Sequence, residues 1–376
     1  MSRFETKDLA VGYGGSILIH DINVKLERGQ ILTLIGPNGA GKSTVLKSVA
    51  RQLAPIGGAV YIDGRKLSGM TQKELSKQMS VVLTDRIRPE LMTCAEVVAM
   101  GRYPYTDMFG RLTEEDRDAV RGALSLVRAL ELSERDFSTL SDGQRQRIML
   151  ARAICQEPSV MVLDEPTAYL DIRHKIELLA VLRDMAKRGV TVIMSLHEID
   201  LAVKISDLLL CLKGDTVAAF GTPEEILGDD TIERLYDLMP GSYDLTFGSV
   251  ELLKPEGLPR VFVVSGAGSG VPVFRGLQKT DVPFAAGILF ENDVDFHVAQ
   301  RLSDFVVSAP PFEPMTDAHF NAASRLLSSC GAVIDAGAPM GTLNAQNARL
   351  ISFAKSRDIP VYESLEAMQK REKVTI

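Results

Sequence analysis

A glycine-rich segment places the strongest constraint on what this chain can fold into. Residues 36–44 read Gly-Pro-Asn-Gly-Ala-Gly-Lys-Ser-Thr, between the apolar run 31–35 and the helix-forming run 45–50. A strand, a G-x-x-x-x-G-K-S turn and a helix in this order form a phosphate-binding loop. Backbone N–H groups and the helix N-terminus then bind anionic oxygens. The predicted nucleoside triphosphate site is made by Gly36, Pro37, Asn38, Gly39, Ala40, Gly41, Lys42, Ser43 and Thr44.

Two further apolar runs end in polar side chains that suit the same chemistry. One leads into Asp164 and Glu165, and the other leads into His197. The carboxyl ends of neighbouring parallel strands meet at one edge of a sheet, so these groups are expected beside the phosphate loop. We predict that Asp164 and the Ser43 hydroxyl hold Mg²⁺, while Lys42 reaches the β- and γ-phosphates. Glu165 is predicted to be the general base toward water, and His197 to hydrogen-bond the γ-phosphate. Alone, the Asp164–Glu165 pair is more typical of a solvated acidic turn, and His197 is more typical of a structural histidine.

Charge and composition disfavour several classes of protein. The chain has 42 basic and 49 acidic side chains, a net charge of −7, so a nucleic-acid partner is not expected. No apolar stretch approaches the length of a membrane span, and the N-terminus lacks the apolar region of an export signal. The four cysteines have no paired spacing, so we expect reduced thiols and neither a disulfide framework nor a zinc site.

The 376 residues are expected to form two α/β domains. The first covers residues 1–240 and contains a helical insertion at about 88–140, in which Thr93 with Glu96 and Thr113 with Asp116 resemble capping boxes. A linker is predicted at 241–259, because this stretch mixes glycines and prolines with little apolar sequence. The second domain covers 260–376. A helical insertion in an α/β domain, such as that at about 88–140, often docks a partner.

A further motif, Leu-Ser-Asp-Gly-Gln-Arg-Gln-Arg at 140–147, leads into a predicted helix. With the phosphate loop and the two strand ends, it makes the stretch from about Phe4 to Asp237 resemble the nucleotide-binding subunit of an ATP-binding cassette (ABC) transporter. The family signature is Leu-Ser-Gly-Gly-Gln, so this chain departs from it at Asp142. The resemblance implies an α/β P-loop ATPase domain with a helical subdomain. It also implies ATP and Mg²⁺ as cofactors.

The resemblance further implies a head-to-tail homodimer, because the chain carries one set of motifs and the family uses two composite sites. The segment Ala-Tyr-Leu-Asp at 168–171 resembles the loop that crosses that dimer interface. Tyr13 matches the aromatic residue that stacks on adenine, although it could instead be a strand-end aromatic that covers the core. His197 matches the family's switch histidine. The residues implied to face the ATP of the opposite subunit are Ser141, Asp142, Gly143, Gln144 and Asp171.

One family position is not matched. The family places a glutamine that contacts Mg²⁺ after the strand preceding the helical insertion. Here that strand is expected at 81–83, and Asp85 takes the position in the best register. Either Asp85 replaces the glutamine as a metal ligand, or the register is different.

The segment Gly-Arg-Tyr-Pro at 101–104 resembles a stretch in the ATPases of importers for ferric siderophores, haem and cobalamin. The alternative is a helix that simply ends at glycine and proline. The resemblance implies a peripheral subunit on the cytoplasmic face of the cell membrane that energises import of a metal chelate. Two transmembrane permease subunits would dock at the helical subdomain, and a substrate-binding protein would act indirectly.

The second block is expected to be a smaller Rossmann-like domain with an open parallel sheet. Its first strand, at 261–264, is followed by Ser-Gly-Ala-Gly-Ser-Gly, which is G-x-G-x-G and not the full dinucleotide pattern. Gly266, Gly268, Gly270 and the strand-end carboxylate Asp293 form a candidate ligand loop. Alternatively, Asp293 is only a helix N-cap and the domain is structural or dimerising.

Two other functions remain as alternatives. The first is a soluble non-transport ABC ATPase; the short helical insertion and the Gly-Arg-Tyr-Pro segment disfavour it. The second is an ATPase fused to a nucleotide-binding regulatory domain or a reductase, and the incomplete glycine pattern disfavours the reductase.

Overall fold

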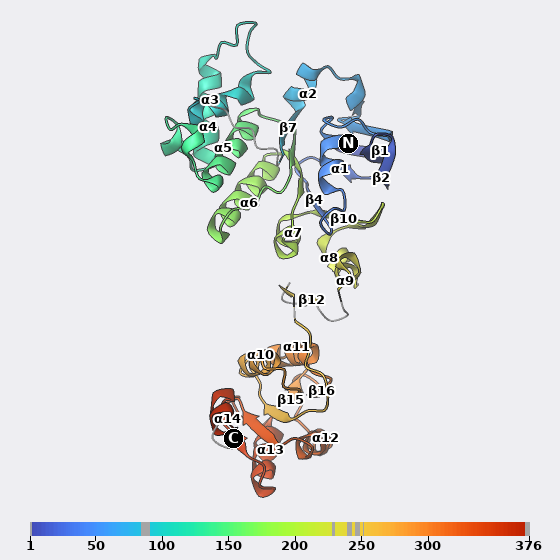
Figure 1. The fold of residues 1–376 in the computed structure, drawn as a ribbon, viewed down its shortest axis with the longest axis vertical. Coiled ribbons are helices and arrows are strands. Elements are labelled where there is room, and N and C mark those ends of the chain that lie inside the picture. Colours follow the sequence, from blue (N-terminus) through green and yellow to red (C-terminus); the bar gives the residue numbers. More distant parts are fainter. Residues whose placement is uncertain are drawn as a thin grey trace. The chain divides into compact units, whose positions relative to one another are not determined.

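A computed structural model describes residues 2–83, 91–227, 230–238, 243–244, 249–250 and 252–372 (Figure 1). The chain divides into two compact units. The first holds the described residues up to 238, and the second holds residues 243–244, 249–250 and those from 252 onward. Among the described residues, no helix is both long and apolar enough to cross a membrane. Cys94, Cys155, Cys211 and Cys330 are all buried free thiols.

The first unit is organised around a mainly parallel sheet in the order β11-β10-β4-β9-β8-β7, with only β11 antiparallel to its neighbour. Every residue of β4, β8 and β9 is buried, as expected for strands covered on both faces. The carboxyl ends of these three strands therefore lie side by side. The strands are β4 (Ile31–Ile35), β7 (Met79–Val82), β8 (Val160–Leu163), β9 (Thr191–Ser195), β10 (Leu208–Lys213) and β11 (Thr216–Gly221).

An antiparallel sheet in the order β2-β1-β5-β6, with β3 also paired to β1, packs on the same core. Leu9 and Ile19 of this sheet share a hydrophobic cluster with Leu34 of the central sheet and Leu46 of α1. The strands are β1 (Phe4–Tyr13), β2 (Ser16–Ile22), β3 (Lys25–Leu26), β5 (Gly57–Ile62) and β6 (Arg65–Lys66). The helices of this unit outside the helical insertion are α1 (Lys42–Val49), η1 (Leu67–Gly69), α2 (Gln72–Gln78), α6 (Ile172–Lys187), α7 (Ile199–Ile205), α8 (Pro223–Leu227) and α9 (Thr231–Tyr236).

A helical subdomain lies between β7 and β8 in the sequence, and its longer helices are labelled α3, α4 and α5 in Figure 1. Both capping boxes predicted from the sequence are present, one at Thr93 with Glu96 and one at Thr113 with Asp116. These boxes satisfy N–H groups that the first helical turn leaves open. The elements are α3 (Cys94–Ala99), η2 (Met100–Arg102), α4 (Glu114–Leu126), η3 (Leu130–Leu132), η4 (Phe137–Thr139) and α5 (Asp142–Cys155).

The Gly-Arg-Tyr-Pro segment ties this subdomain together. Arg102 is buried, and its Nε donates to Asp116 Oδ1 on α4 at 2.8 Å. Its Nη1 donates to the Cys155 carbonyl oxygen at 2.9 Å and to Glu157 Oε2 at 2.8 Å, at the end of α5. A side chain at Gly101 would place Cβ 2.3 Å from the Arg152 carbonyl oxygen. The segment therefore holds η2 against both α4 and α5.

Arg102→Met is expected to destabilise the protein by about 3–5 kcal/mol, because it removes one partner of a buried ion pair and leaves carboxylate and carbonyl groups unpaired. Urea unfolding of the full chain measures this. Arg117→Met is the matched control: Arg117 pairs with Glu114 at 3.4 Å on the exposed face of α4, where an ion pair contributes about 0–1 kcal/mol. Equal unfolding midpoints for the two variants would contradict the anchoring role of Arg102.

The second unit has a sheet in the order β16-β15-β14-β17-β18, and all its strand pairs are parallel. This is the open parallel sheet that the sequence predicts, with a hydrophobic cluster on each face. The strands are β14 (Val261–Val264), β15 (Phe284–Phe290), β16 (Phe305–Ala309), β17 (Ala332–Asp335) and β18 (Val361–Tyr362). The helices are α10 (Val271–Lys279), α11 (Val294–Leu302), α12 (Asp317–Ser328), α13 (Ala345–Ser356) and α14 (Leu365–Glu372).

The stretch predicted as a linker contains one short pairing among its described residues, β12 (Tyr243–Asp244) with β13 (Ser249–Val250), which runs antiparallel.

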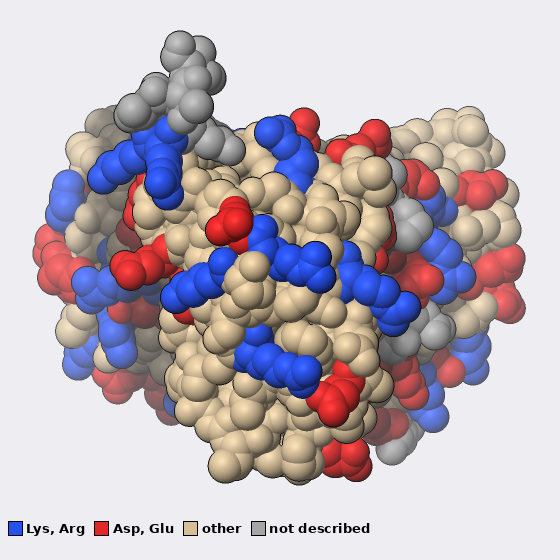
Figure 2. All heavy atoms as spheres, turned by 90° about the horizontal axis from the view of Figure 1, so that it is seen from below, with Lys and Arg blue, Asp and Glu red and all other residues tan. Residues whose placement is uncertain are grey.

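Figure 2 shows one face of the molecule, on which Lys and Arg side chains gather in a central band. Asp and Glu side chains lie beside these basic side chains, and several are in contact with them. This face therefore presents mixed charge and not a single sign.

Candidate active site

The phosphate loop connects β4 to α1, as the sequence predicts, and its backbone needs glycine. Gly36, Gly39 and Gly41 have φ values of 149°, 81° and 84°, which side-chain-bearing residues rarely adopt. A Cβ atom on Gly36 would lie 2.2 Å from the Leu212 carbonyl oxygen, and one on Gly41 would lie 2.7 Å from Ile19 Cδ1. The loop is thus closely packed on its inner side, and helix α1 begins directly after it at Lys42.

Lys42 lies over the loop. Its Nζ donates to the carbonyl oxygens of Gly36 at 2.7 Å and Pro37 at 3.0 Å. Burial lowers the pKa of Lys42, and the charges of Glu165 and Asp164 act in the opposite direction. The ammonium group is therefore within electrostatic reach of both strand-end carboxylates. This combination fits a nucleotide phosphate, which needs a fixed positive charge beside open N–H groups.

The ends of β8 and β9 are bonded directly to each other. Ser195 Oγ donates to Asp164 Oδ1 at 2.7 Å and accepts the backbone N–H of Glu165 at 2.9 Å. His197 Nε2 lies 2.6 Å from Glu165 Oε1. Glu165 has φ of 49°, a left-handed conformation that costs energy for a residue with a side chain and that is concentrated at functional sites. The structure therefore brings the three predicted strand-end residues together, and it adds Ser195, which no sequence motif indicated.

Tyr13 lies beside the start of α1, where its hydroxyl is 3.3 Å from Thr44 Oγ1. The residue is 56% exposed, so it does not cover the core, which was the alternative interpretation. Its ring is available for contact with a flat ligand next to the phosphate loop.

The signature residues form the N-terminus of α5. Ser141 Oγ accepts the N–H of Gln144 at 3.3 Å, and Gln144 Oε1 accepts the N–H of Ser141 at 3.1 Å, which completes a capping box. Asp142 pairs with Arg145 at 3.2 Å. In the part of the chain that the structure describes, Ser141 and Gln144 bond to each other and not to the phosphate loop. A Cβ on Gly143 would lie 3.3 Å from Leu170 Cδ2.

Asp171 is the N-cap of α6, because its Oδ1 accepts the N–H of His174 at 2.9 Å. Asp85 lies outside the described residues. The strand before it, β7, ends at Val82, whose carbonyl oxygen accepts the N–H of Asp164 at 2.8 Å. The end of β7 therefore lies next to the predicted metal ligand Asp164.

The glycine loop of the second unit is bonded to two carboxylates of its own chain. Asp293 caps α11 through the N–H of Asp295 at 3.0 Å, and it also accepts the N–H of Ala267 at 2.7 Å. Asp295 is fully buried and accepts the N–H groups of Gly270 at 2.9 Å and Val271 at 3.2 Å. Burial raises the pKa of Asp295, against the effect of these bonds.

Gly266, Gly268, Gly270 and Asp293 are thus close together, as predicted, but a phosphate would need the same N–H groups at the start of α10. Both meanings that the sequence allowed for Asp293, helix N-cap and loop contact, are present at once. Asp295 was not predicted, because a single aspartate in the first turn of a helix has no distinctive pattern.

The nucleotide loop, the neighbouring carboxylates and the parallel sheet of the first unit define a P-loop ATPase. The sequence model of the ABC transporter family matches residues 19–168, and that of the MJ0874 family matches residues 284–375. An uncharacterized ABC transporter ATP-binding protein of Methanocaldococcus jannaschii is 44% identical over 76% of this chain and 99% of its own length. This chain belongs to the ABC transporter family of ATP-binding proteins.

Other relatives carry substrate names. The iron(3+)-hydroxamate import ATP-binding protein of Bacillus subtilis is 37% identical over 63% of this chain and 89% of its own length. The cobalamin import ATP-binding protein of Halobacterium salinarum is 32% identical over 84% of this chain and 81% of its own length. Since 84% of 376 residues is about 316 and the described part of the first unit ends at residue 238, the cobalamin protein's match continues into the second unit.

Solved structures match the first unit. A subunit of a transporter assigned to the metal-chelate type, in an inward-facing conformation, has a TM-score of 0.55 and 28% identity over 62% of this chain and 89% of its own. A dimeric ATP-binding cassette bound to ADP and phosphate has a TM-score of 0.52 and 25% identity over 58% of this chain and 98% of its own.

Proposed function

We propose that this chain hydrolyses ATP to energise the import of a metal chelate, as a peripheral subunit on the cytoplasmic face of the membrane. The observation that carries the proposal is that the phosphate loop, Asp164, Glu165 and His197 meet at one sheet edge in a chain whose relatives are named for iron-hydroxamate and cobalamin import. Among ferric siderophores, haem and cobalamin, the last has additional support, because the cobalamin protein's match covers 84% of this chain and that of the iron-hydroxamate protein covers 63%.

In this proposal the phosphates lie on the N–H groups of the loop, and Lys42 leaves the loop carbonyls for the β- and γ-phosphates. Mg²⁺ would be held by the Ser43 hydroxyl and the Asp164 carboxylate, hard oxygen donors of the kind this ion prefers, with Asp85 as a further candidate. When bound, the ion neutralises phosphate charge. Glu165 accepts a proton from the attacking water. His197 is bonded to Glu165 and orients the Glu165 carboxylate.

A head-to-tail homodimer is proposed to complete each site. The start of α5 offers N–H groups and a helix dipole to the partner's γ-phosphate. The Asp142 carboxylate, which replaces the family glycine, is paired with Arg145, and this reduces its repulsion toward a phosphate. Tyr169 and Ile172, in and after the loop that ends at Asp171, are 77% and 78% exposed, which suits an interface. A related cassette is dimeric with ADP and phosphate bound.

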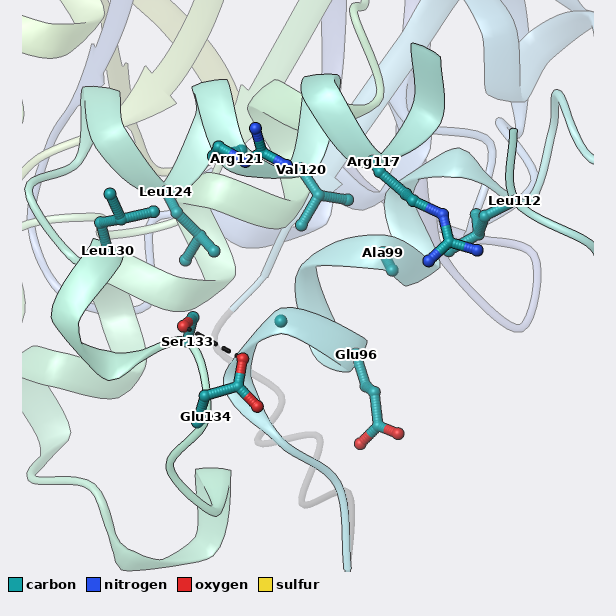
Figure 3. A pocket seen from close by; sticks show the side chains of 11 residues that line it. Glu96, Ala99, Leu112, Arg117, Val120, Arg121, Leu124, Leu130, Ser133 and Glu134 are labelled. Atoms are coloured by element: carbon teal, nitrogen blue, oxygen red, sulfur yellow. Dashed lines mark hydrogen bonds between the residues drawn. The ribbon is translucent and has the colours of Figure 1, made fainter. Parts of the chain in front are cut away.

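The permease is proposed to dock on the helical subdomain, where a pocket of about 300 Å³ opens between α3, α4 and η3 (Figure 3). The charged side chains around it are those of Glu96, Arg117, Arg121 and Glu134. Its apolar lining comes from Ala95, Ala99, Leu112, Val120, Leu124 and Leu130. Met108 and Phe109 of the same subdomain are 97% and 77% exposed. An apolar pocket with a charged rim suits the end of an amphipathic helix.

The import proposal predicts that Leu130→Asp strongly reduces uptake while ATP hydrolysis by the isolated subunit stays unchanged. Leu130 is partly exposed in the pocket, so a carboxylate there would cost about 2 kcal/mol or more in docking, roughly thirtyfold. Uptake of radiolabelled cyanocobalamin and of a ferric hydroxamate is measured in cells whose own copy is deleted. Phe220→Asp, on β11 and similarly exposed, is the control. If neither uptake depends on the chain, the import proposal is wrong.

The second unit is proposed to have a structural or dimerising role. The two fused functions considered above, a regulatory nucleotide site and a reductase, both need an anionic cofactor at the glycine loop. Asp293 and Asp295 already accept N–H groups of this loop. A cofactor phosphate would have to displace them, and this geometry supports neither fused function.

A further inference from the structure

Glu198 lies in the connection that follows β9, and it contacts residues that follow β8. These contacts add to those of Ser195 and His197. Glu198 Oε2 accepts the hydroxyl of Thr167 at 3.1 Å, and its Oε1 accepts Nζ of Lys175 in a short ion pair. Thr167 is buried in the connection that follows the Asp164–Glu165 pair, and Lys175 lies in the first turn of α6, just after its N-cap.

These two partners flank the segment that carries the loop residues Tyr169 and Asp171. The Glu198 carboxylate therefore bonds to both ends of that segment. Because Glu198 follows His197 in the chain, these bonds connect the segment to the His197 region. Burial raises the pKa of Glu198, but the hydrogen bonds from Lys175, the Glu198 backbone and Thr167, together with the Lys175 charge, outweigh burial and leave the pKa below its usual range. The carboxylate is thus ionised at neutral pH, as its ion pair with Lys175 requires.

Four other hydrogen bonds hold this part of the fold together. Ser195 bonds Asp164 and Glu165, and His197 bonds Glu165, as described above. Gln146 Nε2 of α5 donates to the Pro166 carbonyl oxygen at 3.1 Å. Among these contacts, those of Glu198 are the ones that reach past Pro166 to the Asp171 end of the connection.

We propose that Glu198 is a positioning residue for ATP hydrolysis, which fixes the Asp171 loop relative to His197 by holding Thr167 and Lys175. This rests on the proposed function, because the Asp171 loop acts at the ATP of a second copy. Among the described residues, the side-chain partners of Glu198 are Thr167 and Lys175 and not the phosphate loop. Glu198 therefore acts through these two partners. Its loss should slow the assembled site without weakening the phosphate cradle around Lys42.

Steady-state hydrolysis of Mg-ATP by the full-length protein tests the proposal. Glu198→Ala and Lys175→Met should each lower kcat about tenfold, while the Kd for ATP changes by less than about twofold. The double variant should be no slower than the slower single variant, because both changes break one shared contact. Glu198→Gln keeps an acceptor for Thr167 and should recover part of the rate, to within about threefold of wild type.

Asp184→Ala is the matched control, since Asp184 forms an exposed ion pair with Arg188 on the same helix at 2.7 Å, at the end far from the connection. A kcat for Glu198→Ala equal to that of this control overturns the proposal. A fall in ATP affinity and in melting temperature alongside the fall in kcat would also overturn it, because such a pattern indicates a general structural role. If Glu165→Gln hydrolyses ATP normally in the same assay, the proposed function itself fails, and this inference with it.

Discussion

Glu165→Gln is expected to bind ATP with near wild-type affinity and to lose hydrolysis by roughly 10²- to 10⁴-fold, the usual contribution of a general base. The amide keeps the size and the hydrogen bond to His197 but cannot accept a proton from water. The phosphate loop is untouched, so binding energy stays and only the chemical step is lost. Phosphate release and equilibrium nucleotide binding measure the two effects separately.

The same variant should accumulate as an ATP-bound dimer, which size-exclusion chromatography in the presence of Mg-ATP detects. Glu115→Gln, an exposed glutamate in the first turn of α4, is the control and should behave as wild type. Wild-type hydrolysis by Glu165→Gln would remove Glu165 from the role of base, whatever its contact with His197.

Lys42→Ala should have the complementary phenotype, with loss of nucleotide binding itself. Charge-assisted hydrogen bonds to a phosphate contribute about 1.5–3 kcal/mol, so the Kd for ATP should rise by roughly 10- to 150-fold. Isothermal titration with ATP measures this. Lys204→Ala, whose lysine pairs with Asp200 on α7, provides a lysine control in the same unit. Unchanged affinity in Lys42→Ala would contradict the phosphate-cradle interpretation.

Much of the ATP site could be predicted because its signals are local. The phosphate loop needs positive φ at fixed glycines, so its sequence and its backbone are closely linked. Buried parallel strands are continuous apolar runs, and their carboxyl ends share one edge, which brings Asp164, Glu165 and His197 together. The capping boxes at Thr93 and Thr113 likewise involve residues three positions apart.

Contacts between distant segments could not be predicted. Arg102 was noticed only as part of a family-like stretch, yet its partners Asp116 and Glu157 come from two other segments. Glu198 follows His197 and has no distinctive spacing to Thr167 or Lys175. The sequence of the second unit indicates the glycine loop but not the carboxylate that reaches it from α11. In each case the deciding bond depends on how the elements pack, and periodicity alone does not record this.

The glycine loop of the second unit therefore carries a tethered competitor for any anion. Asp295 belongs to the same chain as the N–H groups it accepts, so its effective concentration there is set by the fold and not by diffusion; for tethered groups this is on the order of millimolar or higher. A free phosphate compound would have to overcome this local concentration to bind the same N–H groups. Changes in the cell's supply of such compounds should leave this loop as it is, and a ligand of the second unit must bind elsewhere or displace a buried carboxylate.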